Sequence, residues 1–107
     1  MLYTTPEYFE QIKGLLASLE GLSYSSAMGD YVLVYDKKVV GGIYCNRFMV
    51  KITPISLELL APTAYCIPYP GAKEMLLVER RDPEFLKELI VKTAEQLPSE
   101  RRYRENH

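Results

Sequence analysis

Residues 28 to 52 constrain the fold of this chain most strongly, because they hold three short apolar runs separated by two polar turns. The first two runs, 30 to 35 and 39 to 45, flank the tripeptide Asp-Lys-Lys, a turn of hairpin length. The third run, 47 to 52, follows Asn46, a residue type that tolerates the left-handed backbone of a tight turn. The stretch therefore predicts three consecutive antiparallel strands.

A side-chain oxygen followed by proline predicts the start of three helices, at Thr5-Pro6, Thr53-Pro54 and Asp82-Pro83. Proline suits the first helical position because its missing N–H would have no partner there. We expect the first helix to continue to Gly21 and the middle helix to span about 54 to 60. The first and last helices carry apolar residues on one face only, which indicates that each packs on another layer.

Two further strands are predicted at 64 to 67 and 73 to 79, and a short extended piece is expected around 23 to 27. The element order is then α-β-β-β-α-β-β-α, without the alternation of strands and long helices that parallel sheets need. We predict an α+β fold of two layers, an antiparallel sheet of about five strands with two long helices packed on it. The chain of 107 residues is expected to form one domain, 1 to 98, followed by a polar, disordered tail, 99 to 107.

The central block resembles the amino-terminal domain of the TfoX/Sxy family, named for regulators of bacterial natural competence. The residues that carry the resemblance are Met28-Gly29, Tyr31 to Tyr35, Gly41-Gly42-Ile43, Phe48 to Lys51, Tyr65 to Tyr69 and Met75. The resemblance covers roughly residues 24 to 97 and implies a secretion-chaperone-like fold, with helices on one face of a curved antiparallel sheet. Asp30 stands where the family pattern has a glycine, and lysines occupy the place of the hairpin glycine.

Composition and charge exclude several classes of function. A net charge of −1 gives no overall attraction to nucleic acid or anionic lipid, and no apolar run is long enough to cross a bilayer. The amino terminus lacks the features of a signal peptide, so we expect a cytoplasmic protein. The chain has one histidine, at its last position, which predicts no metal site, no cofactor and no catalytic triad.

The chain has two cysteines, whose thiols are potentially reactive. Cys45 and Cys66 have the spacing of neither a redox pair nor a zinc site, and we expect buried or half-buried thiols. A disulfide between them requires that their strands be neighbours, and the cytoplasm disfavours it.

The candidates for partner binding are Tyr31, Tyr35, Lys51 and Tyr69. The tyrosines suit a recognition surface, and they equally suit an ordinary sheet edge. Lys51 is either a functional cation or a lysine that extends its amine into solvent. Gly41-Gly42 marks either the close approach of a ligand or partner, or a bulge or room for a helix.

These observations favour a small regulatory or adaptor domain that acts by protein–protein contact and is not an enzyme. A homodimer is also open, because a small sheet has edges that can pair. One alternative is weak nucleic-acid binding through the turn lysines and the basic residues of the tail. It is less favoured, because few basic residues accompany the aromatic ones. The other alternative is a small-ligand binder or enzyme that uses the Gly41-Gly42 and Lys51 region. A link to competence or transcription follows from the family resemblance alone.

Overall fold

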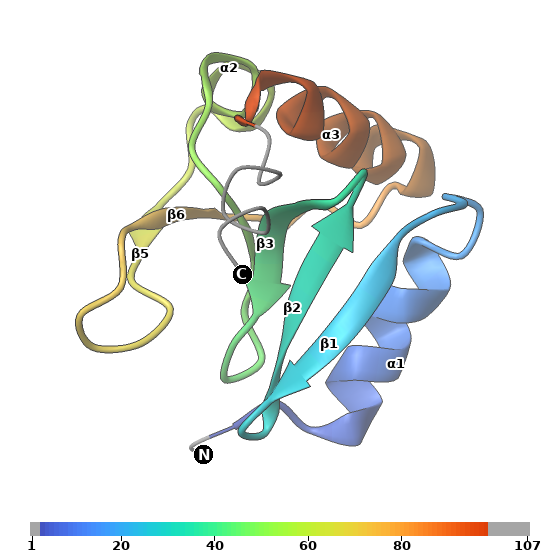
Figure 1. Ribbon diagram of the computed structural model, residues 1–107, viewed down its shortest axis with the longest axis vertical. Coiled ribbons are helices and arrows are strands. Elements are labelled where there is room, and N and C mark those ends of the chain that lie inside the picture. The colour runs from blue at the N-terminus through green and yellow to red at the C-terminus, as the bar shows by residue number, and fades with distance from the viewer. Residues whose placement is uncertain (1–2, 99–107) are drawn as a thin grey trace, which may run out of the picture.

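A computed structural model describes residues 3 to 98 as one antiparallel sheet with its helices packed against it (Figure 1). The helices are α1 (Pro6–Leu15), α2 (Pro54–Leu60) and α3 (Pro83–Gln96). The strands are β1 (Ser23–Ala27), β2 (Asp30–Tyr35), β3 (Lys38–Ile43), β4 (Phe48–Val50), β5 (Tyr65–Cys66) and β6 (Met75–Leu77). Their order in the sheet is β1-β2-β3-β4-β6-β5, so only β5 and β6 depart from the order in the chain.

The predicted α+β class and the antiparallel sheet are confirmed, but the sheet has six strands instead of five. The additional strand is β1, which the sequence indicated only as an extended piece. It pairs along its whole length with β2, from Ser23 opposite Val34 to Ala27 opposite Asp30. Because β1 consists of three serines, a tyrosine and an alanine, it lacks the apolar alternation by which a half-buried strand is recognised.

All three predicted helix starts are confirmed. The side chains of Thr5, Thr53 and Asp82 accept hydrogen bonds from backbone N–H groups of the first turn, and proline follows each cap. The prediction that α1 continues to Gly21 was wrong, because the helix ends at Leu15. Beyond it the chain tightens into short turns, with the Leu19 N–H donating to the Leu16 carbonyl, and both leucines stay buried in the core.

Two-residue turns with left-handed backbone close the three hairpins. Asp36 and Lys37 form the second turn, so β3 begins at Lys38, one residue earlier than predicted. Cys45 and Asn46 form the third turn, which confirms the left-handed conformation expected of Asn46 and places Cys45 outside the strand predicted for it.

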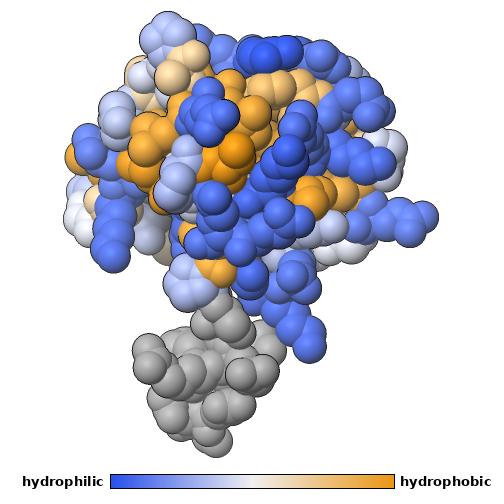
Figure 2. All heavy atoms as spheres, turned by 90° about the horizontal axis from the view of Figure 1, so that it is seen from above, coloured by the Kyte–Doolittle hydropathy of each residue, from blue (hydrophilic) through white to orange (hydrophobic). Residues whose placement is uncertain are grey.

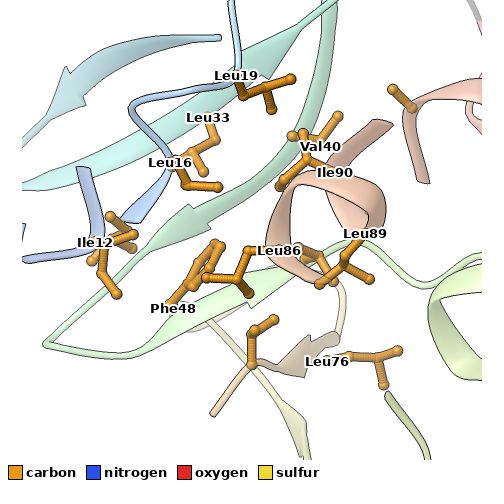
Figure 3. Close-up of a cluster of buried hydrophobic side chains, with 14 of the residues drawn as sticks. Ile12, Leu16, Leu19, Leu33, Val40, Phe48, Leu76, Leu86, Leu89 and Ile90 are labelled. Carbon is orange, nitrogen blue, oxygen red and sulfur yellow. The ribbon is translucent and has the colours of Figure 1, made fainter. Parts of the chain in front are cut away.

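The core lies between the sheet and the helices α1 and α3 (Figure 3). Phe48 of β4 is fully buried near Ile12 of α1 and Leu86 of α3, so one aromatic ring connects both helices to the sheet. The predicted apolar faces of the two long helices are confirmed by the burial of Ile12, Leu86, Leu89 and Ile90.

Candidate functional site

A pocket of about 480 Å³ lies between the end of β4 and the loop that joins β5 to β6, and it brings Lys51 and Tyr69 together. Lys51 directly follows β4, and its backbone is held on both sides. Its N–H donates to the Val40 carbonyl at 2.8 Å, and its carbonyl accepts from the Ser56 hydroxyl at 2.9 Å. Two of the four predicted partner-binding residues therefore share one site. The complete lining is Lys51, Ile52, Pro68, Tyr69, Ala72, Lys73, Glu74 and Met75.

Charged groups surround an apolar centre in this pocket. Lys51 and Lys73 supply two amines and Glu74 one carboxylate, so the rim carries a net positive charge. The Tyr69 ring lies 5.8 Å from the Tyr44 ring, which is itself buried. Burial raises the pKa of the Tyr44 phenol, and Tyr69 and Asp30 add to the shift. The pocket therefore offers hydrogen-bonding and charged groups beside aromatic surface.

Several large apolar side chains are exposed at the β5 end of the sheet. Ile52 and Tyr69 line the pocket, whereas Leu57 and Tyr65 line a separate hollow of about 220 Å³ beside Leu76. Ile52, Leu57, Tyr65, Ile67 and Tyr69 are 37 to 56% exposed, and together with Lys51 they define what we call the β5-side surface. The other large exposed apolar side chains, among residues 3 to 98, are Tyr3 and Met28 near the hairpin of β1 and β2. Seen from the end where α2 and α3 lie, Figure 2 shows apolar side chains in a band interrupted by charged ones. Grouped apolar residues of this kind are typical of binding surfaces.

Tyr31 and Tyr35 do not lie in this site. They share one face of β2, as strand alternation predicts, and this is the face that packs against the core. Tyr31 stacks on Phe9 of α1 with a 3.8 Å separation of ring centroids, and Phe9 meets the Tyr24 ring edge-on. Both predicted tyrosines are half-buried, so any partner contact at them stays a prediction.

Gly41 and Gly42 are explained by close approach within the sheet. A Cβ atom on Gly41 would overlap the Met49 carbonyl oxygen, and one on Gly42 would overlap the Tyr44 ring. The register of β2 and β3 also shifts beside them, between Leu33 and Val34. Atoms of the neighbouring strand and of Tyr44 fill the space next to these glycines, which favours the structural interpretation over a ligand contact.

The basic residues proposed for nucleic-acid binding are dispersed. Lys38 donates its amine to the Ala94 carbonyl at 2.8 Å, near the end of α3, where a cation is favoured by the helix dipole. The Arg47 guanidinium donates to the Tyr44 carbonyl at the opposite end of β3. The basic residues of the tail, Arg101, Arg102 and Arg104, lie outside the described residues, as does the predicted disorder of 99 to 107.

A polar cluster that the sequence did not predict fastens the amino-terminal segment to the sheet. One carboxylate oxygen of Asp30 accepts from the Thr4 N–H, the Thr4 hydroxyl and the Cys45 N–H, at 2.9 to 3.1 Å. The Asn46 side-chain oxygen accepts from the Thr5 N–H at 2.9 Å. These contacts join residues 15 to 41 positions apart, so no local pattern signals them. The contacts tie residues 4 and 5 to the start of β2 and to the turn after β3.

The thiols, the potential metal ligands and the helices of residues 3 to 98 bear on three further classes of site. Cys45 and Cys66 are half-buried free thiols, as predicted, one in the turn after β3 and the other on β5. In this part of the chain no three His, Cys, Asp or Glu side chains gather in a metal-binding arrangement. Nor does any helix there have the length and apolar character to cross a membrane.

No family model and no solved structure match the chain. It is similar to an uncharacterised 12.7 kDa protein in the trpE 5′ region of Spirochaeta aurantia, with 35% identity over 74 residues. Those residues are 66% of this chain and 64% of that protein, so the chain spans less than two thirds of its relative. The resemblance to the TfoX/Sxy amino-terminal domain therefore stays a prediction.

Proposed function

We propose that this protein is a small cytoplasmic regulatory or adaptor domain of bacteria that binds another polypeptide through the β5-side surface. The observation that supports the proposal is the group of exposed apolar side chains at this end of the sheet, two of which, Ile52 and Tyr69, line a pocket that also holds two lysines and one glutamate. Apolar and aromatic centres with charged margins are the usual composition of protein interfaces. A regulatory role linked to competence or transcription is suggested by the family resemblance alone.

Side chains are better placed than backbone to make this contact. The edge strand β5 has only two residues, and Pro68 and Pro70 follow it closely, which limits the addition of a further strand. Tyr65, Ile67 and Tyr69 are instead 51 to 56% exposed and present large contact areas. Lys51, which lines the pocket, would set a preference for a partner segment that carries a carboxylate beside an apolar residue.

The test is affinity capture from nuclease-treated lysate of the source organism, followed by mass spectrometry and a set of variants. The wild type is expected to retain a stoichiometric polypeptide that Tyr69→Ala and Lys51→Ala lose. Tyr3→Ala is the matched control, because Tyr3 and Tyr69 are equally exposed, at 55 and 56%, and Tyr3 lies away from the pocket. Retention of the polypeptide by the Tyr69 and Lys51 variants would show that the β5-side surface is not the binding site.

A second candidate function is the binding of a small anionic molecule, which the volume and lysines of the pocket favour. It predicts that a ligand from a metabolite library raises the melting temperature of the wild type and not of Lys51→Ala. An empty lysate capture together with such a shift would replace the adaptor proposal by this one. Weak nucleic-acid binding has less support, because Lys38 is already engaged by α3.

A further inference from the structure

The two edges of the sheet differ in how well they are protected against pairing with another strand. At one edge, β5 is short and bordered by prolines. At the other edge, β1 has five residues, with neither a charged side chain nor a proline among them. Edge strands of soluble proteins usually carry charges, prolines or bulges that prevent pairing. The β1 edge has none of these within the strand, and Figure 1 shows it as the outermost strand on its side of the sheet.

The register of the first hairpin determines which backbone groups of β1 face outward. Met28 and Gly29 both have positive φ, at 53° and 90°, and they connect Ala27 to its partner Asp30. In a two-residue turn of this type the flanking residues exchange hydrogen bonds, and every second residue along the strand does the same. The backbone groups of Tyr24 and Ser26 are then directed away from β2, toward the free side of the sheet.

Met28 presents a second, independent feature at the same edge. Its side chain is 100% exposed, and its backbone lies in the left-handed region that disfavours residues other than glycine, asparagine and aspartate. In the isolated chain, this side chain buries no apolar surface that would offset the cost of the left-handed backbone. Leu22, at the other end of β1, is a half-buried apolar residue.

We propose that two copies of this chain pair through their β1 strands, antiparallel, around a two-fold axis at Ser25. Tyr24 of each copy then lies opposite Ser26 of the other, so the outward backbone groups of both residues find partners. Met28 lies opposite Leu22 of the second copy, whose side chain packs partly on its own core and covers part of Met28. The pairs contain no charged residue, so the self-pairing meets no like-charge repulsion.

The resulting dimer has one continuous sheet with a β5-side surface at each far end. The dimer contact and the proposed partner site use opposite edges, and neither depends on the other. A dimer would offer two equivalent sites to a partner with repeated segments, which raises the apparent affinity by avidity.

The mass of the full chain in solution, from sedimentation equilibrium, tests the proposal. The wild type is expected at twice 12.3 kDa, and Ser26→Pro at the mass of one chain, because proline removes an outward N–H that pairing needs. Ser26→Thr keeps that N–H and is expected to remain a dimer. A wild-type mass of 12.3 kDa at every concentration, or an unchanged dimer in Ser26→Pro, would overturn the proposal.

A charge exchange at the two-fold axis tests the register without relying on proline. Ser25→Lys and Ser25→Asp each place like charges opposite each other, so each alone should self-associate about fivefold more weakly than the wild type. Mixed in equal amounts, the two variants should form the heterodimer in preference to either homodimer. Equal self-association of the variants and the wild type would refute an axis at Ser25. Since Lys51 and Tyr69 are untouched, capture of a partner reports separately on the proposed function.

Discussion

At the scale of single residues, two glycines of this chain have opposite environments and give a matched comparison. A Cβ on Gly41 would meet the Met49 carbonyl oxygen, whereas a Cβ on Gly14 in α1 has nothing within 4 Å. We expect Gly41→Ala to lower the free energy of unfolding by about 3 kcal/mol, because the sheet must open to admit the methyl group. Gly14→Ala should raise it by about 0.5 kcal/mol through helix propensity. Urea unfolding measures both, and a tolerated Gly41→Ala would contradict the strand spacing described above.

A second residue-scale prediction concerns the Tyr24 phenol. Burial raises its pKa to about 12, from an ordinary value of 10.0. The folded state therefore holds the phenolic proton more tightly than the unfolded state does. This contribution to stability is complete below pH 10 and is lost as the pH rises toward 12. Urea unfolding across this pH range should show that the free energy of unfolding falls less for Tyr24→Phe than for the wild type. Equal losses would place the alkaline sensitivity elsewhere, for example at Tyr44, whose pKa burial also raises.

At the scale of elements, α2 begins with a buried capping box. The Ser56 N–H donates to the Thr53 hydroxyl oxygen at 3.1 Å, and the Thr53 N–H donates to the Ser56 hydroxyl oxygen at 2.8 Å. Ser56→Ala leaves the Thr53 N–H buried without its partner, so we expect a loss of about 2 kcal/mol in the free energy of unfolding. Asp82→Ala, at the exposed cap of α3, should cost about 1 kcal/mol. Thermal or urea unfolding measures both variants. A larger loss for Asp82→Ala than for Ser56→Ala would show that burial of the cap does not set the size of the loss.

At the scale of the whole molecule, pairing of β1 strands would make stability depend on protein concentration. Association favours the folded state by mass action, so the melting temperature of the wild type should rise with concentration. Ser26→Pro should show a melting temperature that does not change over the same range. Differential scanning calorimetry at several concentrations provides the measurement, and a constant wild-type value would argue for a monomer.

Several elements could be predicted because their determinants lie close together in the sequence. Caps act over two or three residues, and a helical face repeats every three or four, so the starts of all three helices and the buried side of α3 were predicted correctly. Two-residue hairpins are equally local, which is why Asn46 was placed correctly. The α+β class follows from the order of these local elements.

Other features depend on contacts between distant residues, and only the tertiary structure decided them. β1 is a strand because β2 offers a partner, and not because Tyr24 and three serines favour one. α1 ends at Leu15, and the turns that follow keep Leu16 and Leu19 in the core without a continued helix. The sequence by itself determined where the helices and hairpins begin. The tertiary structure separated Tyr31 from Lys51 and brought Lys51 beside Tyr69, because the pairing of β4 with β6 carries the loop that holds Tyr69 to the end of β4.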